Sequence, residues 1–180
     1  MFFMKRLEHE VLLEPEFFGP HLTREIRRKL RDEVEGTVVD KDGIVIAVME
    51  TNDVNEIGKG LVEYETGMAS FMVNYSAIVF RPFIHEVIDA HVSVVNEHGF
   101  FASAGPPNFR AFVSRHHMPD DMHYDAGVDT WMTDDEEVEI KKGCVVRMRI
   151  MNLTVNNHGI DSVATIVDNY TGLVESADDV

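Results

Sequence analysis

Residues 97–119 read EHGFFASAGPPNFRAFVSRHHMP, a stretch in which two turn signals separate short runs of strand-forming residues. The first signal, Glu97-His98-Gly99, ends a strand predicted over residues 86–95. The second signal, over residues 105–108, contains two prolines and separates strands predicted at 100–104 and 109–114. Short strands joined by tight turns in this way are typical of a small all-β domain.

The rest of the second half continues the same pattern. Strands are predicted at residues 137–140, 145–153 and 160–167, after an irregular segment at 115–130. About five strands in roughly 100 residues favour a closed OB-fold barrel, and periodicity alone leaves an open sandwich as the alternative. We predict that this domain spans residues 82–174 and that residues 175–180 form a disordered tail.

The first half mixes one helix with several strands. Apolar residues recur every four positions from Leu22 to Val34 within a helix predicted at residues 21–35, and Gly36 follows as a C-terminal cap. Strands are predicted at residues 3–13, 37–39, 44–49, 60–65 and 70–80, around a polar loop at 52–60. The predicted fold class is therefore α+β, with a small sheet and one main helix over residues 1–81 and a boundary at Arg81-Pro82.

The composition excludes several classes of protein. The 180 residues include 32 Asp and Glu against 16 Lys and Arg, and a net charge of −16 disfavours strong binding of RNA. Cys144, the one cysteine, can form neither an internal disulfide nor a Cys-rich zinc site, so a reducing compartment fits. The apolar run at the start stops at Lys5, and no run approaches the ~18 apolar residues of a membrane span. We expect neither a signal peptide nor a membrane partner.

One segment departs from the acidic average. The 22 residues from His98 to Pro119 contain no Asp or Glu. They do contain four phenylalanines, two arginines and two adjacent histidines, namely Phe100, Phe101, Phe109, Phe112, Arg110, Arg115, His116 and His117. Because aromatic rings stack on bases and arginine meets phosphate, the segment is a candidate site for weak binding of single-stranded RNA. Neighbouring strand residues point to opposite faces, so we expect at least two of the four rings to lie in the core.

The sequence gives little support for a catalytic function. The chain contains no nucleophile-elbow, zinc-protease or phosphate-loop motif. A metal enzyme built on His116, His117 and His123 with nearby aspartates is an alternative, but the spacing of these residues matches no known ligand pattern. We expect no catalytic residue, no metal and no cofactor.

Several short motifs occur together in a specific order. In the first half they are MFF at 1–3, EFFGP at 16–20, EVEG at 33–36 and AIVFRPF at 77–83. In the second half they are HGF at 98–100, GP at 105–106, FVSRH at 112–116, MP at 118–119 and DNYTGLV at 168–174. In this order, over nearly the whole chain, they resemble the seventh-subunit family of RNA polymerase II. Members of this family are the larger of the two stalk proteins and have relatives in the archaeal polymerase.

The resemblance implies a ribonucleoprotein-like N-terminal sheet and a C-terminal OB domain of the ribosomal-protein S-one kind. It implies a non-catalytic role in transcription initiation in the nucleus. It also implies three partners: the fourth subunit of RNA polymerase II in an obligate heterodimer, the RNA polymerase II core near the clamp, and emerging single-stranded RNA, bound weakly.

The resemblance further implies two sets of site residues. The RNA-binding set is His98, Phe100, Phe101, Arg110, Phe112, Arg115 and His116. The polymerase-docking set is Asn52, Asn55, Gly58, Lys59 and Gly60, together with the segment before Ser70.

Two other functions are open at this point. One is the equivalent stalk subunit of another RNA polymerase, and the other is a free-standing OB-fold RNA-binding protein. An obligate heterodimer would also leave apolar side chains exposed in the isolated chain, and we expect them at Met49, Met68, Phe71 and Met72.

Overall fold

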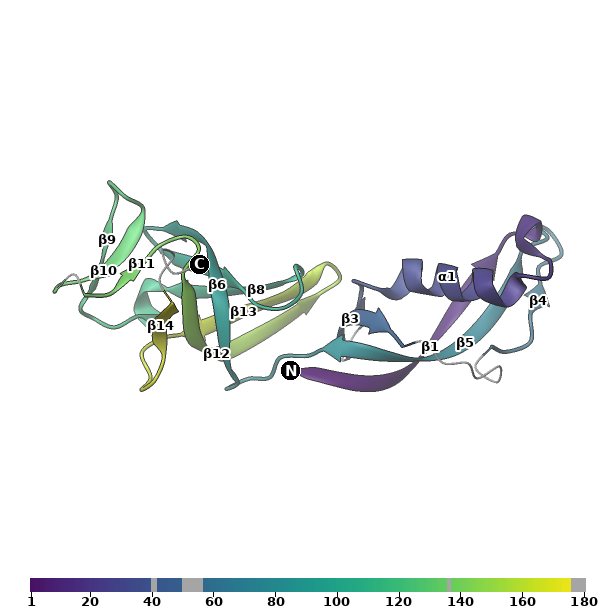
Figure 1. Ribbon diagram of the computed structural model, residues 1–180, viewed down its shortest axis with the longest axis horizontal. Helices are drawn as coiled ribbons and strands as arrows, with labels where there is room; N and C mark the ends of the chain where they lie inside the picture. Colours follow the sequence, from purple (N-terminus) through teal and green to yellow (C-terminus); the bar gives the residue numbers. More distant parts are fainter. Residues whose placement is uncertain (40–41, 50–56, 136, 176–180) are drawn as a thin grey trace. The chain divides into compact units, whose positions relative to one another are not determined.

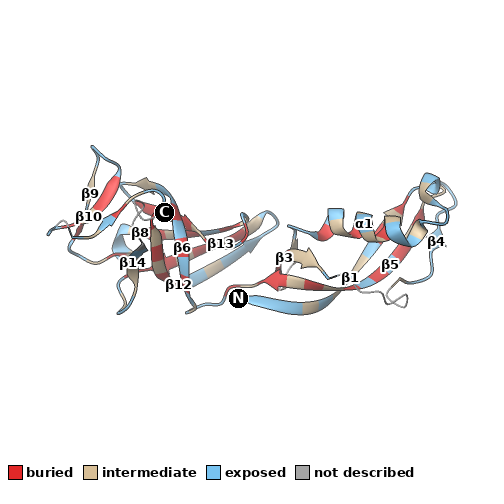
Figure 2. Ribbon diagram, in the orientation of Figure 1, coloured by how far each residue is buried: buried red, intermediate tan, exposed pale blue. Residues whose placement is uncertain are grey.

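The chain folds into two compact units (Figure 1). A computed structural model describes residues 1–39, 42–49, 57–135 and 137–175. The units are Met1–Arg81 and Pro82–Val180, and each has its own sheet and its own buried core (Figure 2). No helix in the described ranges is long and apolar enough to cross a membrane.

The N-terminal unit is an antiparallel sheet with one helix along one of its faces (Figure 1). The strand order is β1-β5-β3-β2, and β4 also pairs with β5. The elements are β1 (Phe2–Leu13), the 3-10 turn η1 (Pro15–Phe17), α1 (Leu22–Val34), β2 (Val38–Val39), β3 (Gly43–Val48), β4 (Leu61–Val62) and β5 (Ala69–Phe80). The predicted combination of a small sheet and one main helix is confirmed.

Alternation along β5 decides which face of this sheet is covered. The odd-numbered residues of β5 are buried against an apolar stripe on α1. The stripe consists of Ile26, Leu30 and Val34, which follow the predicted four-residue spacing. Removing such side chains from water contributes roughly 25 cal/mol per Å² of apolar surface, and this burial holds the helix on the sheet.

The same alternation corrects one of the four predicted exposed positions. Phe71 is an odd-numbered residue of β5 and lies in the core, 8% exposed. Met72 points to the other face and is 45% exposed, and Met49 is 39% exposed. Met68, just before the strand, is half-buried. An unbroken apolar run shows that a strand is present. Which of its residues face the core depends on which face of the sheet the helix covers.

The strand predicted at residues 60–65 is shorter in the structure. Only Leu61–Val62 pairs with β5, because the chain reverses directly after it. The Glu63 N–H donates to the Met68 carbonyl oxygen at 2.8 Å, and the Gly67 N–H donates to the Glu63 carbonyl oxygen at 2.9 Å. These two bonds close a tight turn in place of a longer strand.

Gly43 stands where β3 approaches the backbone of β5. Its φ is +102°, and an added Cβ would lie 2.3 Å from the carbonyl oxygen of Phe80. Gly36 also has a positive φ, +78°, but nothing lies within 4 Å of a Cβ added there. We expect Gly43→Ala to lower the free energy of unfolding by about 2 kcal/mol more than Gly36→Ala, which carries only the left-handed backbone cost. Urea denaturation followed by circular dichroism measures both, and equal losses would contradict the expected clash.

Five strands of the C-terminal unit close into a barrel (Figure 1). They are β6 (Val87–Asn96), β7 (Gly99–Ser103), β8 (Phe109–Ser114), β12 (Val145–Asn156) and β13 (Gly159–Thr165). β6, β7 and β8 pair in sequence as antiparallel neighbours, β8 pairs in parallel with β13, and β12 pairs with both β13 and β6. The ring is complete, as in an OB fold, so the sandwich alternative is wrong.

A small sheet is inserted between β8 and β12. After the 3-10 turn η3 (Arg115–His117) come β9 (Met122–Asp125), β10 (Thr130–Thr133) and β11 (Glu139–Ile140), in the order β11-β10-β9. Trp131 of β10 is 1% exposed, and its indole N–H donates to the Asn96 carbonyl oxygen at 3.0 Å. The insert is therefore anchored to the end of β6. The predicted irregular segment at 115–130 missed β9, because the alternation of Met122 and Tyr124 with His123 and Asp125 is too short to stand out.

One more strand follows the barrel. β14 (Gly172–Glu175) pairs with the start of β12, on the edge opposite β6. Glu175, predicted to begin a disordered tail, is instead the last residue of this strand. Residues 176–180, the rest of the predicted tail, lie outside the described residues.

Candidate nucleic-acid interface

Two phenylalanine rings lie side by side on the outer face of the barrel. Phe101 of β7 is directly opposite Phe112 of β8, with ring centroids 4.7 Å apart and planes inclined at 39°. Both side chains are half-buried, so part of each ring faces solvent. We call Phe101 and Phe112 the aromatic platform, since partly exposed rings of this kind can stack on bases.

Phe100 and Phe109 point the other way, into the barrel. Both are 0% exposed. The expectation that at least two of the four rings are core residues is confirmed, and Phe100 is removed from the predicted RNA-binding set because stacking needs an accessible ring. Of two adjacent phenylalanines in a strand, one must face inward, and the register set at the Gly99 turn decides which one.

Exposed basic side chains continue from one end of the platform. Arg115 and His116 lie in η3, just after Phe112, and both are exposed. The backbone N–H of Arg115 donates to the His98 carbonyl oxygen at 3.0 Å, and this bond brings the β6–β7 turn next to η3. The His98 side chain is 80% exposed and lies 3.5 Å from Glu97. The structure thus brings together three of the predicted RNA-binding residues at this end of the barrel.

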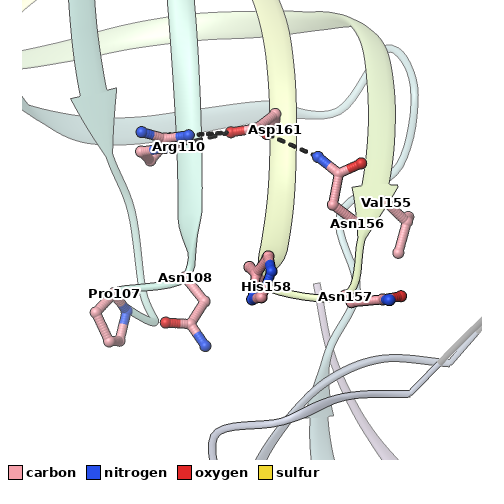
Figure 3. Close-up of a pocket in the computed structure, with 9 residues that line it drawn as sticks. Pro107, Asn108, Arg110, Val155, Asn156, Asn157, His158 and Asp161 are labelled. Atoms are coloured by element: carbon pink, nitrogen blue, oxygen red, sulfur yellow. Dashed lines mark hydrogen bonds and ion pairs between the residues drawn. The ribbon is translucent and has the colours of Figure 1, made fainter.

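Arg110 is exposed beside the platform, but its guanidinium is already bound. Its Nε and Nη2 donate to Oδ1 of Asp161 at 3.2 and 3.0 Å (Figure 3). Asn156 Nδ2 donates to the other carboxylate oxygen, Oδ2, at 2.9 Å. Arg110 and Asp161 line two hollows, one of about 310 Å³ whose wall includes the platform rings and one of about 760 Å³ at the β12–β13 turn.

Carboxylates hold other arginines of the barrel in the same way. Arg147 donates to Asp89 at 2.6 and 2.8 Å, and this hydrogen bonding lowers the pKa of Asp89 from its ordinary value. Arg149 donates to Asp168 at 2.6 Å. Of the four arginines in this unit, Arg115 alone has no ion pair with the residues that the structure describes.

Both units match known protein families. Residues 8–67 match the SHS2 domain found in the N terminus of Rpb7p/Rpc25p/MJ0397, and residues 81–162 match the S1 RNA binding domain. DNA-directed RNA polymerase II subunit 7 of Arabidopsis thaliana is 42% identical over 175 residues, 97% of either chain. The chain belongs to the RNA polymerase II subunit 7 family. Subunit RPB7 of Saccharomyces cerevisiae is 32% identical over 97% of this chain and 100% of its own.

Membership of the subunit 7 family confirms the resemblance seen in the short motifs. An archaeal protein, DNA-directed RNA polymerase subunit Rpo7 of Sulfolobus acidocaldarius, is 25% identical over 97% of this chain and 94% of its own. The S1 match and the closed barrel also confirm the predicted OB fold of the S-one kind.

Three of the five predicted docking residues, Gly58, Lys59 and Gly60, lie just before β4. Asn52 and Asn55 lie outside the described residues. The Gly58 N–H donates to the Met72 carbonyl oxygen at 2.8 Å, which holds this part of the loop on β5. Lys59 is exposed directly after it.

Gly60 is fixed by a close approach to the core. A Cβ added there would lie 2.5 Å from the ring of Phe71, so a side chain at this position would have to displace that ring. Exposed apolar side chains follow at once. Leu61 is 73% exposed, Val62 is 67% exposed and Tyr64 is fully exposed. We call these three residues the apolar tip, which sequence reasoning located only as the segment before Ser70.

Two of the three histidines of the metal-enzyme alternative have separate partners. His117 Nδ1 lies 3.0 Å from the Ser114 hydroxyl, and His123 Nδ1 lies 3.3 Å from Asp134. Over the described ranges, no group of three or more His, Cys, Asp or Glu side chains could hold a metal ion. The described geometry therefore gives the metal-enzyme alternative no support.

Proposed function

We propose that this chain is a non-catalytic stalk subunit of RNA polymerase II. In this role it pairs with the fourth subunit, docks near the clamp during transcription initiation in the nucleus, and contacts emerging RNA. The observation that carries the proposal is the identity of 42% and 32% to plant and yeast RNA polymerase II subunits over 97% of the chain. The similarity includes both units and the segment that joins them.

The outer face of the barrel supports the contact with RNA. The aromatic platform offers two partly exposed rings, and Arg115 offers a guanidinium that no described carboxylate holds. A single guanidinium of this kind in an acidic protein favours weak binding of RNA. Weak binding is sufficient for a tethered barrel, because docking on the polymerase would raise its effective concentration near the transcript.

The apolar tip supports docking on the polymerase core. Leu61, Val62 and Tyr64 are among the most exposed large apolar side chains of the described residues. Contiguous exposed apolar surface on a soluble protein marks a binding surface. Docking would favour the clamp state to which the tip binds more tightly, by as much as its affinity differs between the two states.

The face of the N-terminal sheet opposite α1 supports a heterodimer. Phe2 is 52% exposed and Met4 is 69% exposed at even-numbered positions of β1. Met72 is 45% exposed on the same face of the sheet, further along it, where β5 pairs with Glu10. The fourth subunit is our proposed cover for this face. Expressed alone, the chain should self-associate through it.

Affinity purification of the tagged chain from its native extract, followed by mass spectrometry, tests the assignment. We expect the fourth subunit and the large RNA polymerase II subunits to be recovered in comparable amounts. Subunits of polymerase I or III would keep the architecture and change the enzyme that it serves. Ribosomes, exosome components or the chain alone would overturn the stalk assignment and favour a free-standing RNA-binding protein.

A further inference from the structure

The pair formed by Arg110 and Asp161 is built into the register of the barrel. The two residues are direct partners in the parallel pairing of β8 and β13, and both side chains lie on the outer face. Arg110 is 66% exposed and Asp161 is 45% exposed, so a bound molecule could reach both. Asn156 holds the second carboxylate oxygen from β12, which leaves Oδ1 to accept both bonds from the guanidinium.

We infer that Asp161, by binding the Arg110 guanidinium, keeps it from binding phosphate, and that this contact determines how the barrel binds single-stranded RNA. We call this effect of Asp161 the mask. The inference rests on the proposed contact between the barrel and RNA. A carboxylate and a phosphate compete for the same N–H donors at the edge of a guanidinium. With Asp161 in place, a phosphate at Arg110 must displace a charge-assisted contact and approach a negative charge at the same time.

The mask changes the kind of contact that Arg110 can make. Two of the five guanidinium N–H donors are bound to Asp161, and the plane of the group is held beside the hollow that the platform lines. A fixed guanidinium can still stack on a base or donate to a base edge. Binding at this face should therefore come mainly from stacking, with phosphate contact left to Arg115.

Removing the charge of Asp161 tests the mask. The full-length chain, its Asp161→Asn variant and the double variant Asp161→Asn/Arg110→Gln are titrated into a fluorescent single-stranded RNA of about 12 nucleotides. We expect Asp161→Asn to bind roughly fivefold more tightly at about 50 mM salt, and its log–log salt slope to be steeper by about 0.7, the value for one added phosphate contact on a single strand. The double variant should lose both gains, because they depend on Arg110.

Asp89→Asn is the matched control. Asp89 also pairs with an arginine, and its side chain is 45% exposed like that of Asp161, but it lines neither hollow. The Asp89→Asn substitution removes the same charge from the same unit, and it should leave the salt slope of RNA binding unchanged. Equal gains from Asp89→Asn and Asp161→Asn would overturn the mask and show a general effect of net charge. Thermal unfolding of each variant checks that the barrel is intact.

The remaining outcomes separate the mask from the proposed RNA contact. If the unaltered chain binds RNA through the platform and Asp161→Asn gains nothing, the mask is wrong and the RNA contact stands. If only Asp161→Asn binds measurably, the mask is supported and RNA contact by the unaltered barrel is not. If neither protein binds RNA, both ideas fail.

Discussion

Phe100→Ala is expected to lower the free energy of unfolding of the barrel unit by about 3–5 kcal/mol. Phe100 is 0% exposed, and truncation to alanine would remove its apolar contacts and leave a cavity among rigid strands. The measurement is urea denaturation followed by fluorescence. Trp131, the one tryptophan of the chain, is buried in this unit and reports its unfolding.

Phe101→Ala is the control for this prediction. The two phenylalanines are neighbours on β7, but Phe101 is half-buried on the outer face, so its truncation should cost less than half as much. Losses of the same size at both positions would contradict the assignment of Phe100 to the core and Phe101 to the surface. Phe101→Ala should lower RNA affinity more than Phe100→Ala does, because only the Phe101 ring can stack on a base.

Phe101→Leu/Phe112→Leu is expected to weaken binding of single-stranded RNA at least tenfold. Stacking contributes roughly 1–3 kcal/mol per base, and each 1.4 kcal/mol is a factor of ten in affinity. Leucine keeps most of the apolar packing between β7 and β8 and removes the aromatic faces, so the barrel should stay folded. Fluorescence anisotropy at low salt measures the affinity, and the loss should persist at high salt because stacking is not screened.

Tyr170→Leu is the control for the platform. Tyr170 is 94% exposed in the connection between β13 and β14, so it is an accessible ring that does not line the hollow beside the platform. Its replacement should leave RNA affinity unchanged. An equal loss at Tyr170, or no loss in the platform variant, would place the RNA contact elsewhere on the chain.

Much of the architecture could be predicted from local patterns. The four-residue spacing from Leu22 to Val34 predicts α1 and its buried stripe, and each of the three residues of that stripe is in the core. The turn signal Glu97-His98-Gly99 predicts a hairpin that the structure contains. These signals are local, because helix periodicity and turn chemistry depend on residues a few positions apart.

The site was predicted less completely, since its geometry depends on long-range pairing. The acid-free segment from His98 to Pro119 contains Phe101, Phe112 and Arg115 of the candidate surface. It could not separate Phe100 from Phe101, because two adjacent apolar residues fit either phase of a strand. The apolar tip was also missed as a set of residues, since exposure of Leu61 and Val62 follows from the short pairing of β4.

Local patterns and motifs were enough to establish the helix, most of the strands, the boundary region near Pro82 and the resemblance to the subunit 7 family. Long-range packing was needed to establish that β8 and β13 pair in parallel, which closes the barrel and sets Arg110 against Asp161 from 51 residues away. It was needed equally to establish which phenylalanines are buried and why Gly43 cannot carry a side chain. Register between distant strands depends on the packing of the whole core, and no local pattern encodes it.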